Sequence, residues 1–160
     1  MPRTDFARIR CPVARAMEVL GERWSILVMR EAFYGTTRFD DFARHLGIAT
    51  NILSARLAKL VEHDLLERVP EGARHAYRLT EKGGAFFPVF LALKGWSDRW
   101  MAGPEGQAMC LLDAGTGEEV VCPPPLDSAG RPLTPEGIRL VPGPAASEAM
   151  RRRFPGTAHG

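Results

Sequence analysis

The sequence predicts a mainly α-helical fold with one small β-hairpin. Two short helix patterns stand close together: one spans residues 38–48 and ends near Gly47, and the next spans residues 49–60. Two strand patterns follow at residues 65–69 and 74–79, with a Pro-Glu-Gly turn between them. Helix, turn, helix and hairpin in this order predict a winged helix-turn-helix domain. After it we expect a short β-ribbon appendage at the C-terminal end.

Length and composition limit the class of protein. The chain of 160 residues is 45% hydrophobic and 25% charged, which is ordinary for one globular domain with a small appendage. No apolar run reaches the roughly 20 residues of a transmembrane helix, and arginines interrupt the N-terminal stretch where a signal peptide would be apolar. Three cysteines do not make a disulfide framework in a chain of this size. We therefore expect a cytoplasmic protein without a membrane partner.

Composition changes near residue 103. Nine of the 13 prolines lie at or beyond Pro104, which disfavours long helices there. We expect a DNA-binding and dimerisation domain over residues 1–103 and a Pro/Gly-rich β-ribbon extension with a tail over residues 104–160. The first segment carries 16 Lys and Arg against 12 Asp and Glu, a net of +4, and the second carries 5 against 7, a net of −2. This division places the positive charge with the helix-turn-helix, as contact with phosphates requires.

Two further helix patterns flank the motif. Pro12 is a favourable first helical residue, and apolar residues at three- and four-residue steps follow as far as Gly35, with a break at Gly21. Between Ala85 and Met101, apolar residues cover more of the helix circumference than one core-facing stripe requires. The additional apolar face predicts a homodimer; the alternative is a helix enclosed between the winged domain and the extension. The candidates for the dimer interface are Met17, Phe90, Leu93, Trp96 and Trp100.

The second motif helix has an apolar face, which we expect to pack inward, and a polar face with small residues that lets the backbone approach base edges. Asn51 can bond an adenine edge with two hydrogen bonds, and Arg56 can reach guanine or a phosphate. Thr50 can cap the helix and present its first N–H groups to a phosphate. Basic residues of the hairpin suit phosphates or the minor groove. The candidate DNA-binding residues are Arg38, Thr50, Asn51, Ser54, Arg56, Lys59, Arg74, His75 and Arg78. The alternative is an ordinary solvated helix surface.

Together these segments resemble the HxlR-type family of bacterial winged helix-turn-helix transcription regulators. The matching segments are Cys11-Pro12-Val13, Leu20-Gly21-Glu22-Arg23-Trp24, Arg38-Phe39, Leu53-Ser54-Ala55-Arg56-Leu57 and Tyr77-Arg78-Leu79-Thr80-Glu81-Lys82-Gly83. The resemblance implies a homodimer held by its first and last helices, which binds a pseudo-palindromic operator in double-stranded DNA. It implies regulation of neighbouring genes, with repression favoured here. It also implies, for several members, a response to oxidants or electrophiles through a cysteine near the N-terminus.

Cys11 is the candidate for such a redox sensor, with a small molecule or an oxidant as the effector. It precedes a predicted helix start, where the helix dipole stabilises a thiolate, and several arginines lie close to it in sequence. A small, half-buried residue that fills a helix junction explains the position equally well. The sequence leaves both interpretations open.

The extension resembles a zinc-ribbon-like segment of some family members, but its cysteine pattern is broken. Gly115-Thr116-Gly117 and Cys122-Pro123-Pro124-Pro125 stand where cysteine pairs are expected. A structural zinc site needs four Cys or His ligands, and the segment offers only Cys110, Cys122 and distant His159. We therefore expect a degenerate β-ribbon without metal or cofactor. Cys110 and Cys122 could face each other across a hairpin, as free thiols in a reducing compartment.

Two other classes of function compete with transcription regulation. An enzyme would need a nucleophile with a base, or paired carboxylates, in one constellation, and the histidines of this chain lie inside motif elements instead. We therefore do not expect an enzyme. The remaining alternative is a winged-helix interaction module that no longer binds DNA.

Overall fold

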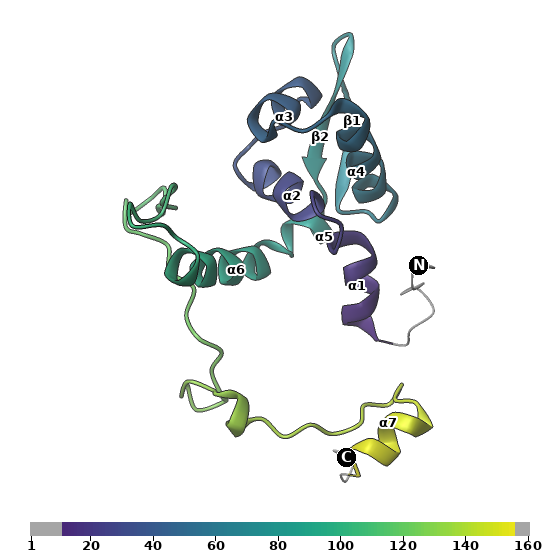
Figure 1. Cartoon of the computed structure of the whole chain (residues 1–160), viewed down its shortest axis with the longest axis vertical. Coiled ribbons are helices and arrows are strands. Elements are labelled where there is room, and N and C mark those ends of the chain that lie inside the picture. The colour runs from purple at the N-terminus through teal and green to yellow at the C-terminus, as the bar shows by residue number, and fades with distance from the viewer. Residues whose placement is uncertain (1–10, 156–160) are drawn as a thin grey trace. The chain divides into compact units, whose positions relative to one another are not determined.

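The computed structural model of the chain describes residues 11–155. These residues divide into two compact units, and Figure 1 labels the helices and strands along the chain. One unit covers Ala16–Cys122, and the other joins the described residues that precede and follow it. The larger unit thus continues through the first part of the extension, and a domain boundary after residue 103 remains a prediction.

The larger unit contains the expected helices and hairpin in the expected order. Its elements are α1 (Pro12–Leu20, whose first residues belong to the other unit), α2 (Ser25–Phe33), α3 (Phe39–Leu46), α4 (Thr50–Glu62), β1 (Leu66–Glu71), β2 (Arg74–Leu79), α5 (Glu81–Gly84) and α6 (Phe87–Trp100). Gly47 ends α3 with φ of 59°, in the left-handed region that glycine adopts without steric cost. The mainly α fold with a small β-wing is therefore confirmed.

The core lies where α2, α3 and α4 meet the base of the hairpin. Its fully buried side chains come from apolar residues at helical spacing, and they include Val28, Met29, Phe42, Leu53, Leu57 and Leu60. Because Leu53, Leu57 and Leu60 all point into this core, the opposite face of α4 is left to solvent. The orientation predicted for the second motif helix is confirmed.

The two strands form an antiparallel hairpin in which Leu66 lies opposite Leu79 and Glu71 lies opposite Arg74. The turn is formed by residues 72–73, with a positive φ of 62° at Gly72. The Pro-Glu-Gly turn expected from the sequence is therefore wrong by two residues, because its proline and glutamate continue the strand. Proline is tolerated at this position because the sheet has only two strands and both are edges.

The segment Thr80-Glu81-Lys82-Gly83 fixes the hairpin relative to α4. The hydroxyl of Thr80 accepts a hydrogen bond from the N–H of Gly83 (3.0 Å) and donates one to the carbonyl oxygen of Asp64 (2.6 Å), just beyond the end of α4. A Cβ atom at Gly83 would lie 1.9 Å from the carbonyl oxygen of Leu65. Only glycine fits this close approach, which explains the residue's place in the motif.

The extension forms turns rather than regular strands. Leu112 pairs with Glu119 and Leu126 pairs with Pro132, each as an isolated bridge, and the described residues beyond position 103 contain no strand. The predicted β-ribbon is thus reduced to single bridges, in a segment whose prolines lack the N–H groups that a ladder needs. If the register of the first bridge continued, Val121 and not Cys122 would lie opposite Cys110.

The sequence did not predict the helical elements near the C-terminal end. A 3-10 turn, η2, covers Pro135–Gly137, and the helix α7 covers Glu148–Arg153. The hydroxyl of Ser147 caps α7 by accepting a hydrogen bond from the N–H of Met150 (3.3 Å). The segment treated as a tail therefore contains a short capped helix.

Candidate nucleic-acid interface

The exposed face of α4 carries the short polar side chains predicted to contact bases. Thr50, Asn51 and Ser54 are exposed, together with Ala55 and Ala58. The N-cap is Ala49, without a side-chain hydrogen bond, so the expectation that Thr50 caps the helix is wrong. The first N–H groups of α4 have no partner within the helix, and the positive end of its dipole is available to a phosphate.

Arg56 and Lys59 lie on the flank of α4, where they pair with acids from α1 and the segment after it. Arg56 Nη2 lies 2.9 Å from Glu22 Oε2, and Lys59 Nζ lies 3.4 Å from Glu18 Oε1. Both basic side chains are only about one-fifth exposed, at 20% and 21%. In the single chain the ion pairs hold the two side chains against the body of the domain. A contact with DNA would require these pairs to open, and that Arg56 and Lys59 contact DNA stays a prediction.

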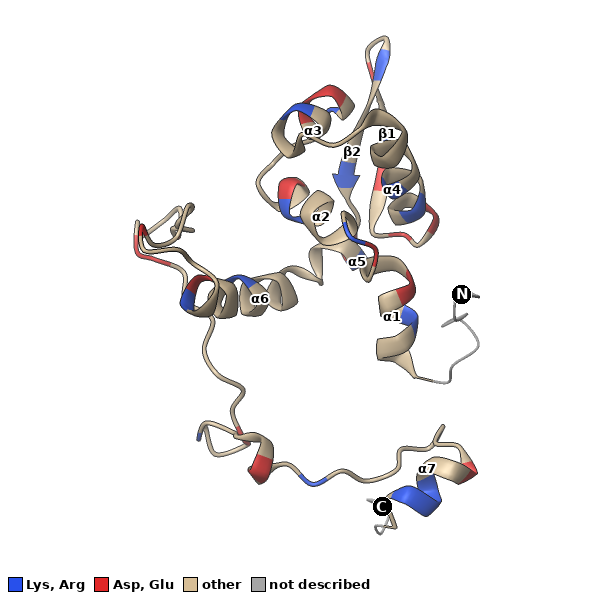
Figure 2. Ribbon diagram, in the orientation of Figure 1, with Lys and Arg blue, Asp and Glu red and all other residues tan. Residues whose placement is uncertain are grey.

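The hairpin, the start of α3 and α4 enclose a cleft of about 480 Å³. Four of the predicted DNA-binding residues line it: Arg38, Ser54, Arg74 and His75. The other lining residues are Phe39, Asp40, Arg68 and Tyr77. Figure 2 marks basic residues of the hairpin in blue on the ribbon. The fold thus brings guanidinium groups that are far apart in sequence next to the exposed face of α4.

Ion pairs partly neutralise these arginines. Glu71 lies 2.5 Å from Arg38 and 3.6 Å from Arg78, and Asp40 lies 3.0 Å from Arg74. Exposed pairs of this kind contribute little to stability, so a DNA phosphate can replace the carboxylate at small cost. Two carboxylates therefore limit the positive charge that three arginines present to a ligand.

The Glu71→Gln variant is expected to bind every DNA duplex more tightly than the wild type. The substitution removes the carboxylate that holds Arg38 and Arg78, and an exposed pair is worth about 0.2–1 kcal/mol, so the gain should be up to about fivefold. Affinity should also depend more steeply on salt. Fluorescence anisotropy on specific and scrambled duplexes measures both effects. The control is Glu62→Gln at the exposed end of α4, and equal affinities of the two variants would contradict a role for these arginines.

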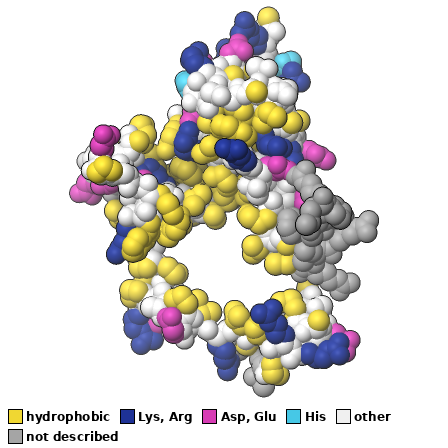
Figure 3. Space-filling view, in the orientation of Figure 1, with side chains coloured by type: hydrophobic (Ala, Val, Ile, Leu, Met, Phe, Trp, Pro, Cys, Tyr) yellow, Lys and Arg dark blue, Asp and Glu magenta, His cyan; other side chains and the backbone are white. Residues whose placement is uncertain are grey.

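The helices α1 and α6 each carry exposed apolar side chains. Met17 on α1 is exposed, and so are Val89, Leu93, Trp96 and Trp100 on α6. Figure 3 shows hydrophobic side chains gathered over the region of α6. Four of the five candidate interface residues are therefore accessible to a partner.

Phe90 is the exception among the interface candidates. It is 4% exposed, and its ring centroid lies 5.2 Å from that of Phe33 and 6.1 Å from that of Tyr34. These contacts anchor α6 to α2 within one chain, so the expectation that Phe90 contacts a partner is wrong.

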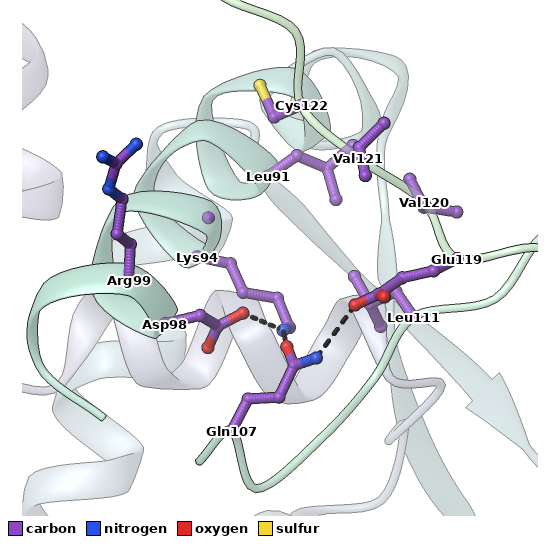
Figure 4. Close-up of a pocket in the computed structure, with 11 residues that line it drawn as sticks. Leu91, Lys94, Asp98, Arg99, Gln107, Leu111, Glu119, Val120, Val121 and Cys122 are labelled. Carbon is purple, nitrogen blue, oxygen red and sulfur yellow. Dashed lines mark hydrogen bonds and ion pairs between the residues drawn. The ribbon is translucent and has the colours of Figure 1, made fainter. Parts of the chain in front are cut away.

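Another side of α6 is covered by the beginning of the extension, which leaves a cleft of about 510 Å³ (Figure 4). Lys94 Nζ donates to Asp98 Oδ2 (2.5 Å) and Gln107 Oε1 (3.4 Å), and Gln107 Nε2 donates to Glu119 Oε1 (2.9 Å). These bonds attach the extension to α6. The expectation of an enclosed helix is thus met on one side only, because Trp96 and Trp100 stay exposed.

A buried carboxylate on α2 was not expected from the sequence. Glu31 is 7% exposed, and it accepts hydrogen bonds from Arg30 (2.9 Å) and Thr36 (3.2 Å), while His45 Nδ1 lies 3.3 Å away. The cluster ties α2 to α3 and so fixes the first motif helix. The available signal was an acidic residue inside the apolar stripe of α2.

Cys11 is half-buried immediately before α1 and is a free thiol, as is Cys110. Its carbonyl oxygen accepts the N–H of Arg15 at 3.1 Å, which starts the helix. Both interpretations of this position, sensor and packing residue, agree with this geometry. Between residues 11 and 155 no three His, Cys, Asp or Glu side chains are grouped so that they could hold a metal ion. No helix in that range has the length and apolar character needed to cross a membrane.

Comparisons with known proteins agree on one family. The model of HxlR-like helix-turn-helix proteins matches residues 19–105. Rv3095 of Mycobacterium tuberculosis, an uncharacterised HTH-type transcriptional regulator, is 41% identical over 139 residues, which cover 82% of this chain and 85% of the relative. The solved structure of PA1607, a candidate transcription factor, has a TM-score of 0.81 at 39% identity and covers 86% of this chain and 99% of its own. Quinone-bound YodB of Bacillus subtilis has a TM-score of 0.50 at 32% identity and covers 56% of this chain and 99% of its own.

Proposed function

The chain belongs to the HxlR-like helix-turn-helix family of transcriptional regulators, which are not enzymes, and from that premise we propose that it represses transcription as a homodimer on a pseudo-palindromic operator. The proposal rests on one observation, which is that two features of the surface lie next to each other. The exposed polar face of α4 lies beside the arginine-lined cleft of the wing, so base contacts and phosphate contacts can form together.

In this proposal α4 is the recognition helix and enters the major groove with its N-terminal half. Asn51 and Ser54 reach base edges, and Ala55 and Ala58 allow the helix backbone to come close. Arg38, Arg74 and Arg78, with His75, bind the neighbouring backbone or minor groove. The wing arginines thus supply affinity, and the polar face of α4 supplies sequence preference.

The homodimer is supported by the exposed apolar side chains of α1 and α6. Exposed apolar patches on a soluble domain mark interaction sites, and tryptophan is enriched where interfaces derive most of their energy. Trp96 and Trp100 lie on one such patch. A two-fold dimer would place two copies of α4 on half-sites about one helical turn, roughly 34 Å, apart.

We further propose that oxidants or electrophiles regulate the protein through Cys11. The half-buried thiol of Cys11 directly precedes the N-terminal end of α1, and α1 also carries Met17 of the proposed interface. Treatment with a quinone is expected to weaken DNA binding by the wild type but not by Cys11→Ser. The matched control is the double variant Cys110→Ser, Cys122→Ser, which should respond like the wild type. Equal responses of the wild type and Cys11→Ser would contradict the proposal.

The proposed function is tested by sequencing the genomic DNA fragments that the purified protein retains. We expect a shared motif with two-fold symmetry, placed near promoters. If a folded protein retains no fragments above background, the winged-helix interaction module becomes the better explanation.

A further inference from the structure

The two compact units differ in charge. The unit Ala16–Cys122 contains 12 Lys and Arg against 15 Asp and Glu, a net of −3, and the rest of the chain contains 9 against 4, a net of +5. Division of the sequence at residue 103 instead places a net of +4 with the helix-turn-helix, because it includes the four arginines before residue 16 and leaves out the four carboxylates of residues 104–122. The unit Ala16–Cys122 thus carries no net positive charge, although residues 16–103 alone carry a net of +1.

The helix α7 concentrates this positive charge in the described part of the other unit. Arg151, Arg152 and Arg153 are consecutive and exposed in its last turn (Figure 2). Arg151 is engaged within the unit, because it donates to the carbonyl oxygen of Pro144 at 3.0 Å. The side chain of Arg152 is 74% exposed, and Arg153 lies over the ring of Phe154, 5.0 Å from its centroid. Arg152 and Arg153 are therefore the two guanidinium groups that α7 offers to a partner.

The carboxylates of this unit do little to neutralise α7. Backbone N–H groups, that of Arg131 first, lower the pKa of Asp127, whose carboxylate is occupied within its own turn. The pKa of Glu136 is also lowered, first by a backbone hydrogen bond in the η2 turn. Glu148 lies 3.5 Å from Arg152, but its side chain is 81% exposed, and such a pair is weak. An incoming anion can therefore replace Glu148 at little cost.

We propose that the helix α7 is a second DNA-contacting surface, on which Arg152 and Arg153 bind backbone phosphates without regard to sequence. The proposal rests on the proposed function, since the partner is the same duplex. Guanidinium groups match phosphate geometry with two parallel hydrogen bonds, and neutralised phosphates release counterions, which drives association. General DNA affinity is thereby shared between the wing arginines and α7, and sequence preference stays with α4.

The test is the double variant Arg152→Gln, Arg153→Gln in the full chain, assayed on operator and scrambled duplexes across salt concentrations. The slope of log affinity against log salt should fall by about 0.9 for each phosphate that the variant no longer neutralises. If each protomer of the variant neutralises two fewer phosphates, the wild type should lose roughly tenfold more affinity per protomer than the variant between 50 and 200 mM salt. The ratio of operator to scrambled affinity should not change.

The control variant is Arg23→Gln, which removes an exposed arginine between α1 and α2 and should leave the slope unchanged. A double variant with the wild-type slope, and with unchanged thermal unfolding, would overturn the inference. If the proposed function itself failed, the result would be different. The wild-type protein would then bind the operator and the scrambled duplex with equal affinity, whatever the slope of log affinity against log salt.

Discussion

Replacing Trp96 and Trp100 together by glutamate is expected to convert the protein from a dimer into a monomer and to remove high-affinity operator binding. The two side chains are 52% and 63% exposed in the single chain, so the substitutions leave its core intact. In a dimer they would bury unpaired carboxylates in an apolar contact, which is strongly unfavourable. Because a monomer lacks the second binding event on the same duplex, affinity should fall by about 10²-fold or more.

Sedimentation velocity at micromolar concentration checks the change of mass, and anisotropy on the operator checks the affinity. The control is Leu112→Glu with Val121→Glu, two exposed apolar residues of the extension that are not on the proposed interface. The control should remain dimeric. If the tryptophan variant also remains dimeric, the interface lies elsewhere on the chain.

The Asn51→Ala variant is expected to bind the operator less tightly by about 1–3 kcal/mol for each base that Asn51 reads, which is roughly 5- to 150-fold in affinity. Asn51 is exposed in the first turn of α4, so its truncation should leave the free energy of unfolding nearly unchanged. The effect should be confined to the preferred base at one position of each half-site. On duplexes with that base replaced, wild type and variant should bind alike.

Arg74→Ala provides the contrast to Asn51→Ala. Because Arg74 is proposed to contact phosphates, its removal should weaken all duplexes by the same factor and lower the salt slope by about one for each phosphate that Arg74 neutralises. If Asn51→Ala also weakened all sequences equally, α4 would be a phosphate-binding helix and not the source of specificity.

Local patterns predicted most of the winged domain. Gly47 ends α3, and the spacing of Leu53, Leu57 and Leu60 indicated the inward face of α4. Both features could be predicted because each depends only on residues that are close together in the sequence. The hairpin followed from strand patterns and a turn. Its turn was misplaced because Pro70 was expected to end the strand, whereas in a two-stranded sheet it can remain within it.

The sequence could not show which charged side chains form ion pairs with one another. Glu18 pairs with Lys59 and Glu22 pairs with Arg56, and the two pairs hold the basic side chains against the domain. These partners are distant in sequence and become neighbours only when α1 packs beside α4. Phe90 was misplaced for a related reason: when apolar residues surround a helix, periodicity cannot distinguish the face that covers the core from the face that meets a partner.

The distribution of positive charge differs from the sequence-based expectation for the same physical reason. A boundary chosen from proline content assigned the N-terminal arginines to the winged domain, and the structure groups the described residues near them with the C-terminal segment instead. Formal charge follows from sequence, but its distribution over surfaces depends on the fold.

The exposed polar face of α4 is proposed to give this protein sequence-specific DNA binding. The most direct measurement is competition between a recovered operator duplex and a scrambled duplex of equal length for the wild-type protein at physiological salt. Specific binding should exceed non-specific binding by about 10³-fold or more. Equal competition by the two duplexes would contradict the account.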